Sequence, residues 1–117
     1  MQITPEIFLK LLSDATRLRS LLLLQAEGEL CVCELTYALD DIQPKVSRHL
    51  AALRDAGIVM DQRRGQWIYY RINPGLPAWA RELLGAVARG AEEQKRYKDD
   101  LKKLGKMPRR PENRICA

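Results

Sequence analysis

The sequence predicts a mainly α-helical domain that carries a single β-hairpin. Three observations indicate this fold class. Apolar residues recur at helical spacing over much of the chain, two short segments of this kind flank a polar break between residues 30 and 56, and an alternating, aromatic-rich stretch follows at residues 66–72. With 117 residues, the chain has the length of one domain with a modest core, for which a partner subunit would add stability.

Two helices are expected at the N-terminal end. Residues 5–12 form a short apolar segment, and residues 14–26 form a longer one that Gly28 ends. The run LRSLLLL in the longer segment is expected to be core. Arg17 and Arg19 lie beside this apolar stripe, and we expect them to be solvated rather than bound to phosphate.

The middle of the chain predicts a helix-turn-helix, with the break at Asp40 and Asp41. Its second helix begins at Gln43-Pro44, where proline is tolerated because the missing N–H would have no partner there. The outward side of this helix carries side chains that suit base edges and phosphates, although an ordinary solvated helix face has a similar composition. These candidate DNA-binding residues are Gln43, Lys45, Ser47, Arg48 and His49.

A β-hairpin is expected directly after this pair of helices. Residues 58–63 and 66–72 favour strands, joined by a connection at Arg64-Gly65. Arg63 and Arg64 make the tip basic, which suits the DNA backbone or minor groove, whereas a plain hairpin would only close the core. Its place after the helix pair favours a wing, so the predicted fold is a winged helix-turn-helix.

The C-terminal part predicts one long helix from residue 77 to about residue 103. Its apolar face is too long for so small a domain to cover, so we expect a homodimer that pairs the C-terminal and N-terminal helices of two subunits. The expected domain spans residues 1–104. Residues 105–117 are basic and broken by proline, which predicts a flexible tail.

Composition favours an anionic partner. The chain holds 20 Lys and Arg against 15 Asp and Glu, which gives a net charge of +5 and a pI near 9.3. No apolar run is long enough to span a bilayer and no secretory signal opens the chain, so a cytoplasmic protein without a membrane partner is expected. In that reducing compartment, three cysteines suggest a metal or redox site rather than a disulfide framework.

Cys31 and Cys33 lie where the first helix of the pair begins. In a regular helix, residues two apart point to nearly opposite sides, so both thiolates can bind one ion only if the backbone departs from helical geometry. The helix start is where this departure costs least, and the helix dipole there favours the thiolate, although Glu34 opposes it. The alternative is that buried cysteines act only as small hydrophobes.

Several segments together resemble the ArsR/SmtB family of metal-responsive repressors, and in particular its arsenic-responsive branch. They are ELCVCEL, SDATRLR, QPKVSRHLAALRDAGIV, RRGQWIYYRI, PAWA and NRICA. The resemblance implies a homodimeric repressor, not an enzyme, that binds an inverted repeat in the double-stranded operator of an arsenic-resistance operon. It also implies release when As(III) or Sb(III) binds Cys31 and Cys33, with no obligatory cofactor. The positions of Gln43, Ser47 and Arg48 match residues that face DNA in this family.

The chain departs from the family pattern at two positions. Thr36 stands where a third cysteine is common, although trivalent arsenic prefers three soft ligands. Cys116 in the tail is one candidate for the third ligand; a hydroxide or a methyl group on arsenic is another. Ile42 stands where a capping serine is expected, so Asp41 is expected to cap the helix instead.

Two other functional classes follow from the cysteines. The first is a redox-responsive repressor in which Cys31 and Cys33, or one of them with Cys116, form a disulfide. The second is a thiol-dependent enzyme, against which the sequence offers no Gly-rich phosphate loop and no general base near the cysteines. A zinc sensor is disfavoured because the C-terminal helix lacks the histidines that the family's zinc sensors use.

Overall fold

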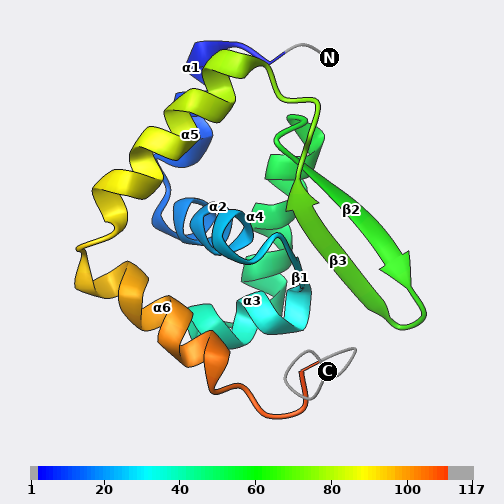
Figure 1. The fold of residues 1–117 in the computed structure, drawn as a ribbon. Helices are drawn as coiled ribbons and strands as arrows, with labels where there is room; N and C mark the ends of the chain where they lie inside the picture. Colours follow the sequence, from blue (N-terminus) through cyan, green and yellow to red (C-terminus); the bar gives the residue numbers. More distant parts are fainter. Residues whose placement is uncertain (1–2, 111–117) are drawn as a thin grey trace.

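The computed structural model describes residues 3–110, and Figure 1 shows their arrangement. The N-terminal helices, the helix-turn-helix and the hairpin follow the predictions closely, which confirms the winged helix fold. The elements in chain order are α1 (Pro5–Leu12), α2 (Ala15–Glu27), β1 (Glu29–Cys31), α3 (Val32–Leu39), α4 (Gln43–Asp55), β2 (Val59–Arg64), β3 (Trp67–Ile72), α5 (Ala78–Ala91) and α6 (Lys95–Gly105).

The hairpin belongs to a three-stranded antiparallel sheet with the order β1-β3-β2. Strand β1 was not predicted, because three residues are too few to show a period. It pairs Cys31 with Tyr69 and Glu29 with Arg71, which fixes the cysteine segment to the base of the wing. The tip is a two-residue turn at Gly65 and Gln66, one residue later than predicted, and Gly65 adopts a φ of 61° that favours glycine.

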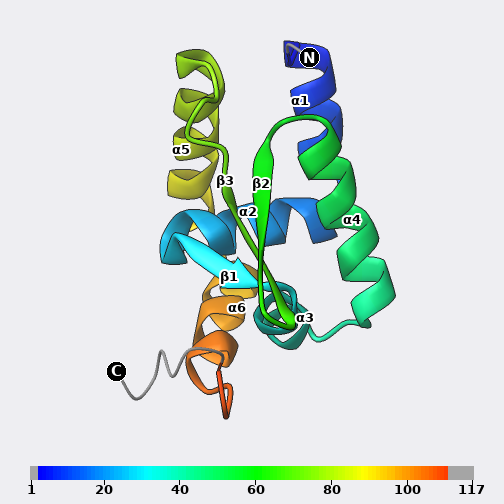
Figure 2. The same cartoon turned by 90° about the vertical axis from the view of Figure 1, so that its right-hand side faces the viewer.

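Helices α3 and α4 form the helix-turn-helix, with α4 and the wing on the same side of the molecule (Figure 2). Helix α4 turns Val46, Leu50 and Leu53 into the core, as its periodicity predicts. The expected cap by Asp41 is wrong. Asp41 accepts a hydrogen bond from the neighbouring N–H of Ile42 and pairs with Lys45, and α4 begins without a side-chain cap.

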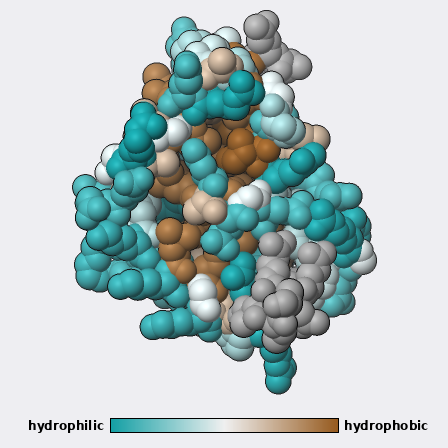
Figure 3. Space-filling model, viewed as in Figure 1, coloured by the Kyte–Doolittle hydropathy of each residue, from teal (hydrophilic) through white to brown (hydrophobic). Residues whose placement is uncertain are grey.

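Helix α2 runs through the centre of the domain, where Leu21, Leu23 and Leu24 are buried. The Asp14 carboxylate caps its start by accepting the Arg17 N–H at 3.0 Å. Figure 3 shows apolar side chains gathered in the middle of the face seen in Figure 1, with hydrophilic side chains around them.

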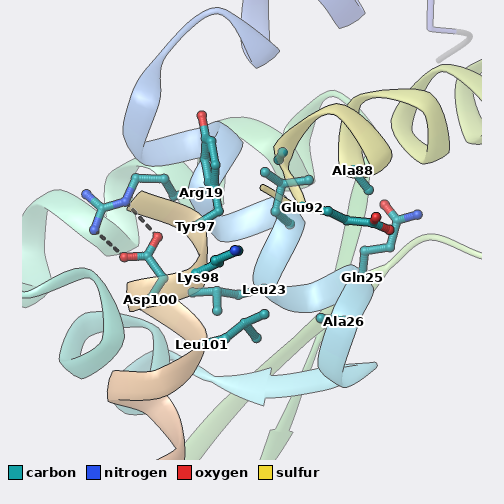
Figure 4. A pocket seen from close by; sticks show the side chains of 12 residues that line it. Arg19, Leu23, Gln25, Ala26, Ala88, Glu92, Tyr97, Lys98, Asp100 and Leu101 are labelled. Atoms are coloured by element: carbon teal, nitrogen blue, oxygen red, sulfur yellow. Dashed lines mark hydrogen bonds and ion pairs between the residues drawn. The ribbon is translucent and has the colours of Figure 1, made fainter. Parts of the chain in front are cut away.

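The prediction of one long C-terminal helix is wrong. The chain breaks between Ala91 and Lys95, and the separate helix α6 folds back on α2 and α3. Asp100 of α6 is buried and pairs with Arg19 of α2 at 2.7 Å, beside a pocket of about 260 Å³ that α2, α5 and α6 line (Figure 4). Arg19 therefore holds two helices together, and the expectation that it is only solvated is wrong as well.

Candidate inducer and DNA site

The two central cysteines lie side by side. Cys31 is the N-cap of α3 and keeps the extended backbone of β1, with φ of −81° and ψ of 163°. Cys33 lies two residues further on, in the first turn of α3, and its Cα is 5.4 Å from that of Cys31. A disulfide joins the two Sγ atoms. The departure from helical geometry that two adjacent sulfurs require is therefore present at Cys31.

Glu34 fixes the backbone of this segment. Its Oε1 accepts the Cys31 N–H at 2.8 Å, and its own N–H donates to Cys31 Sγ at 3.3 Å, which together form a capping box. The Glu34 side chain is fully buried, and Arg110 Nε donates to its other oxygen at 2.6 Å. Arg110 also lies 3.6 Å from Glu27, so a residue of the expected flexible tail is anchored beside the cysteines.

A cavity of about 660 Å³ lies between the cysteines, helix α4 and the wing. Cys31, Cys33 and Thr36 border it from one side, and the wing borders it from another. Helix α4 contributes Gln43 and Ser47. The complete lining is Cys31, Val32, Cys33, Thr36, Gln43, Ser47, Ala51, Arg54, Gln66, Trp67, Ile68 and Tyr70.

The predicted reading residues of α4 differ in their surroundings. Gln43 and Arg48 are exposed, Ser47 is half-buried, and Arg48 forms no hydrogen bond or ion pair with any residue in the described range 3–110. Lys45 pairs with Asp41 at 2.9 Å, which leaves its ammonium at the surface near the start of the helix. Gln43, Ser47 and Arg48 thus remain available to a partner on this side.

His49 lies against the N-terminal end of α2. Its Nδ1 is 3.2 Å from Arg17 Nη1 and 3.7 Å from Asp14 Oδ2, and its side chain is 15% exposed. Burial raises the pKa of Asp14, but the Arg17 N–H and the charges of His49 and Arg17 outweigh it and lower the pKa below its ordinary value. Arg17 also donates to the Leu11 carbonyl at 2.7 Å, so it is not merely solvated either.

The two arginines of the wing also differ. Arg63 is exposed and donates to the Gly65 carbonyl at 3.1 Å. Arg64 donates to both carboxylate oxygens of Glu29 at 2.8 and 2.9 Å, and its guanidinium lies 4.6 Å from the centre of the Tyr69 ring. Arg64 thus ties the wing to β1, whereas Arg63 is free to face a partner.

Within residues 3–110, no group of three His, Cys, Asp or Glu side chains could hold a metal ion. Cys116, the third cysteine of the sequence, lies outside the described residues. In the same described range, none of the helices has both the length and the apolar composition to cross a membrane.

Sequence reasoning missed two contributors to this region. Arg54 lines the cavity and pairs with Asp61 at 3.2 Å, and its place on α4, seven residues after Ser47, is the signal that could have shown it. Arg110 meets Glu34 across 76 positions of the chain, and no local pattern predicts such a contact.

Comparison with known proteins places these features in context. Residues 14–61 match the family model described as "Bacterial regulatory protein, arsR family". The chain is 50% identical to the arsenic resistance transcriptional regulator ArsR1 of Pseudomonas putida, over 98% of this chain and 89% of that protein. It is 49% identical to the arsenical resistance operon repressor of Escherichia coli, over 73% of each chain.

A solved structure shows the same similarity in three dimensions. The AntR antimony-specific transcriptional repressor superposes with a TM-score of 0.61 and is 33% identical, over 75% of this chain and 79% of that chain. The sequence relatives and this structure are all transcriptional regulators by name.

Proposed function

Because this chain belongs to the arsR family of bacterial regulatory proteins, which are DNA-binding repressors and not enzymes, we propose that it represses an arsenic-resistance operon. Trivalent arsenic or antimony is the inducer, and Cys31 and Cys33 bind it. No resident cofactor takes part in this proposal, and we expect the protein to act in the cytoplasm, on operator DNA.

One observation carries the proposal. The adjacent sulfurs of Cys31 and Cys33 border the same cavity as Gln43 and Ser47 of α4. A ligand that binds the sulfurs would therefore lie in a cavity that is also lined by α4, the helix that we expect to read DNA. Two thiolates suit a soft ion such as trivalent arsenic, which requires the disulfide to be reduced first.

Operator recognition is proposed to rest on α4 and the wing tip. Gln43, Ser47 and Arg48 would contact base edges, while Lys45 and Arg63 would contact phosphates. His49 would orient α4 through Asp14 rather than read bases, because its side chain is largely buried there. Arg64 would support the wing from behind through Glu29.

The operator-binding form is proposed to be a homodimer. Helices α1 and α5 meet where Phe8 packs edge-on against Trp79, with ring centres 5.6 Å apart. Trp79 leaves 37% of its surface exposed, and Ile7 and Leu9, the two neighbours of Phe8 in the chain, leave 38% and 54% exposed. A twofold pair through this face would present two copies of α4 to successive major grooves, about 34 Å apart, which fits an inverted repeat.

In this proposal, release follows from coupling between the cysteine site and the operator-binding surface. Arsenic bound to both sulfurs changes the start of α3, which β1 ties to the wing and the short turn at Asp40 ties to α4. By linkage, the operator must weaken arsenic binding by the same factor as arsenic weakens operator binding, typically ~1–3 kcal/mol.

The test is operator binding measured by fluorescence anisotropy in the presence of a thiol reductant, while arsenite is titrated. We expect arsenite to release the wild type, and Cys33→Ser to bind the operator normally but to resist release. Release of Cys33→Ser at wild-type arsenite concentrations would refute the proposed site.

The same titration on Cys116→Ser decides the role of the third cysteine. Failure of this variant to respond would make Cys116 the third arsenic ligand. Normal release would leave a two-thiol site.

A redox-responsive repressor is the second candidate, favoured by the disulfide between Cys31 and Cys33. A two-electron oxidant such as diamide, added after the reductant is removed, would then release the operator, and arsenite would not. Release by arsenite from the reduced protein supports the metalloid sensor instead.

A further inference from the structure

The hydroxyl of Thr36 stands out among the groups around the cavity. Its Oγ1 atom is buried and forms no hydrogen bond with any residue of the described chain. A threonine within a helix commonly donates to the carbonyl four residues earlier, but this one does not. Buried polar groups are nearly always paired, so an unpaired one next to a cavity calls for a partner such as a water molecule or a ligand atom.

Thr36 also lies in the right place to meet such a ligand. It borders the same cavity as both cysteines. Cys33 and Thr36 are three residues apart on α3, so their side chains share one face of the helix. The cavity is thus bordered on one side by two cysteines and by a threonine whose hydroxyl is unpaired.

Arsenite chemistry supplies an oxygen at this point. After two low-molecular-weight thiols have reduced the disulfide and left as their own disulfide, As(OH)₃ reacts with the two Cys thiols. Two As–O bonds break, two As–S bonds form, and each thiol proton leaves with one hydroxide as water. Arsenic stays trivalent and keeps its third hydroxide, since residues 3–110 contain no thiol besides Cys31 and Cys33.

We propose that the Thr36 hydroxyl donates a hydrogen bond to the hydroxide that arsenic retains when it binds Cys31 and Cys33. This inference rests on the proposed function and adds a specificity-determining residue to it. Thr36 would favour inorganic arsenite over an organoarsenical, whose third position is occupied by carbon and cannot accept the bond.

The test compares two arsenic compounds on three proteins, the wild type and two variants, with affinity read from the near-ultraviolet absorbance of the arsenic–thiolate bonds in the reduced protein. Thr36→Val removes the hydroxyl at constant shape, and Thr36→Ser retains it. We expect Thr36→Val to bind arsenite about tenfold more weakly, as for the loss of one hydrogen bond, and Thr36→Ser to bind near the wild-type level. Phenylarsine oxide should bind all three proteins equally. Operator affinity without arsenic verifies that the variants fold.

Two results would overturn the inference while the proposed function stands. One is that Thr36→Val loses the same affinity for both compounds, or loses affinity for neither of them. The other is loss of arsenite binding in Cys116→Ser, which would give the third position to sulfur. If wild type binds neither compound, the proposed function itself fails.

Discussion

Arg48 is the residue on which we expect sequence discrimination to depend most. It is exposed on α4 and engages no other side chain in the described structure, so its guanidinium is free to pair with a guanine edge. Arg48→Ala should weaken operator binding by about 1–3 kcal/mol and reduce the preference for operator over unrelated DNA. Competition titrations with both DNAs measure this change.

Lys45 offers the matched control on the same helix. It pairs with Asp41 near the surface and is expected to contact phosphate only. Lys45→Ala should therefore weaken binding to operator DNA and to unrelated DNA about equally. It should also lower the salt dependence of binding by roughly one released ion. Loss of discrimination in Lys45→Ala but not in Arg48→Ala would reverse the two roles.

The side chain of Arg110 is expected to contribute to the stability of the fold. Its guanidinium is 9% exposed and meets the fully buried Glu34 carboxylate at 2.6 Å. Arg110→Ala removes this cation from a buried charge and should lower the free energy of unfolding by about 3 kcal/mol. Urea denaturation measures the loss. Lys106→Ala, at an exposed position four residues earlier, should change the midpoint little, and an equal loss there would show that the contact is not specific.

Helix α6 owes its position to one buried ion pair. Asp100 receives two hydrogen bonds from Arg19, at 2.8 and 2.7 Å, and this bonding raises the pKa of Arg19. Asp100→Ala leaves that guanidinium without its carboxylate and should cost about 3 kcal/mol of stability. Asp99→Ala next door removes only an exposed pair with Lys95 and should change the stability little. Similar thermal midpoints for the two variants would contradict the structural role of α6.

The elements that local sequence determines are those that were predicted well. Helix α2 has a capping Asp14 at its start and Gly28 at its end, and α4 carries its apolar residues at regular spacing. The same holds for the wing, whose turn needs a residue with positive φ that Gly65 supplies. The sequence also predicted what an approach of Cys31 and Cys33 requires, namely a backbone that departs from helical geometry. The extended conformation of Cys31 at the start of α3 meets this requirement.

What the sequence did not reveal depends on contacts between distant segments. Strand β1 exists because Glu29–Cys31 pairs with β3, some 40 residues away. The break after Ala91 has no proline to announce it, and it is α6 packing on α2 and α3 that makes two helices of the expected one. The roles of Arg19 and Arg110 follow from partners 81 and 76 positions away.

At the scale of the whole molecule, the break before α6 changes which surface a second subunit would meet. Because α6 folds back onto its own chain, it covers part of the core that the expected long helix would have left for a partner. The exposed apolar residues of α1 and α5 then remain as candidate contacts, which are Ile7 and Leu9 on α1 and Trp79 on α5.

Leu9 tests this contact. Its side chain is 54% exposed and makes little contribution to the core of its own subunit, so a charge there should spare the fold but not a subunit interface. Leu9→Glu should convert a dimer to a monomer in light scattering and weaken operator binding severely, because a single α4 then meets a single half-site. Met60→Glu, on the wing strand β2 and 40% exposed, is the control that should stay dimeric. If Leu9→Glu also stays dimeric at the same concentration, the two subunits must join through a different face of the molecule.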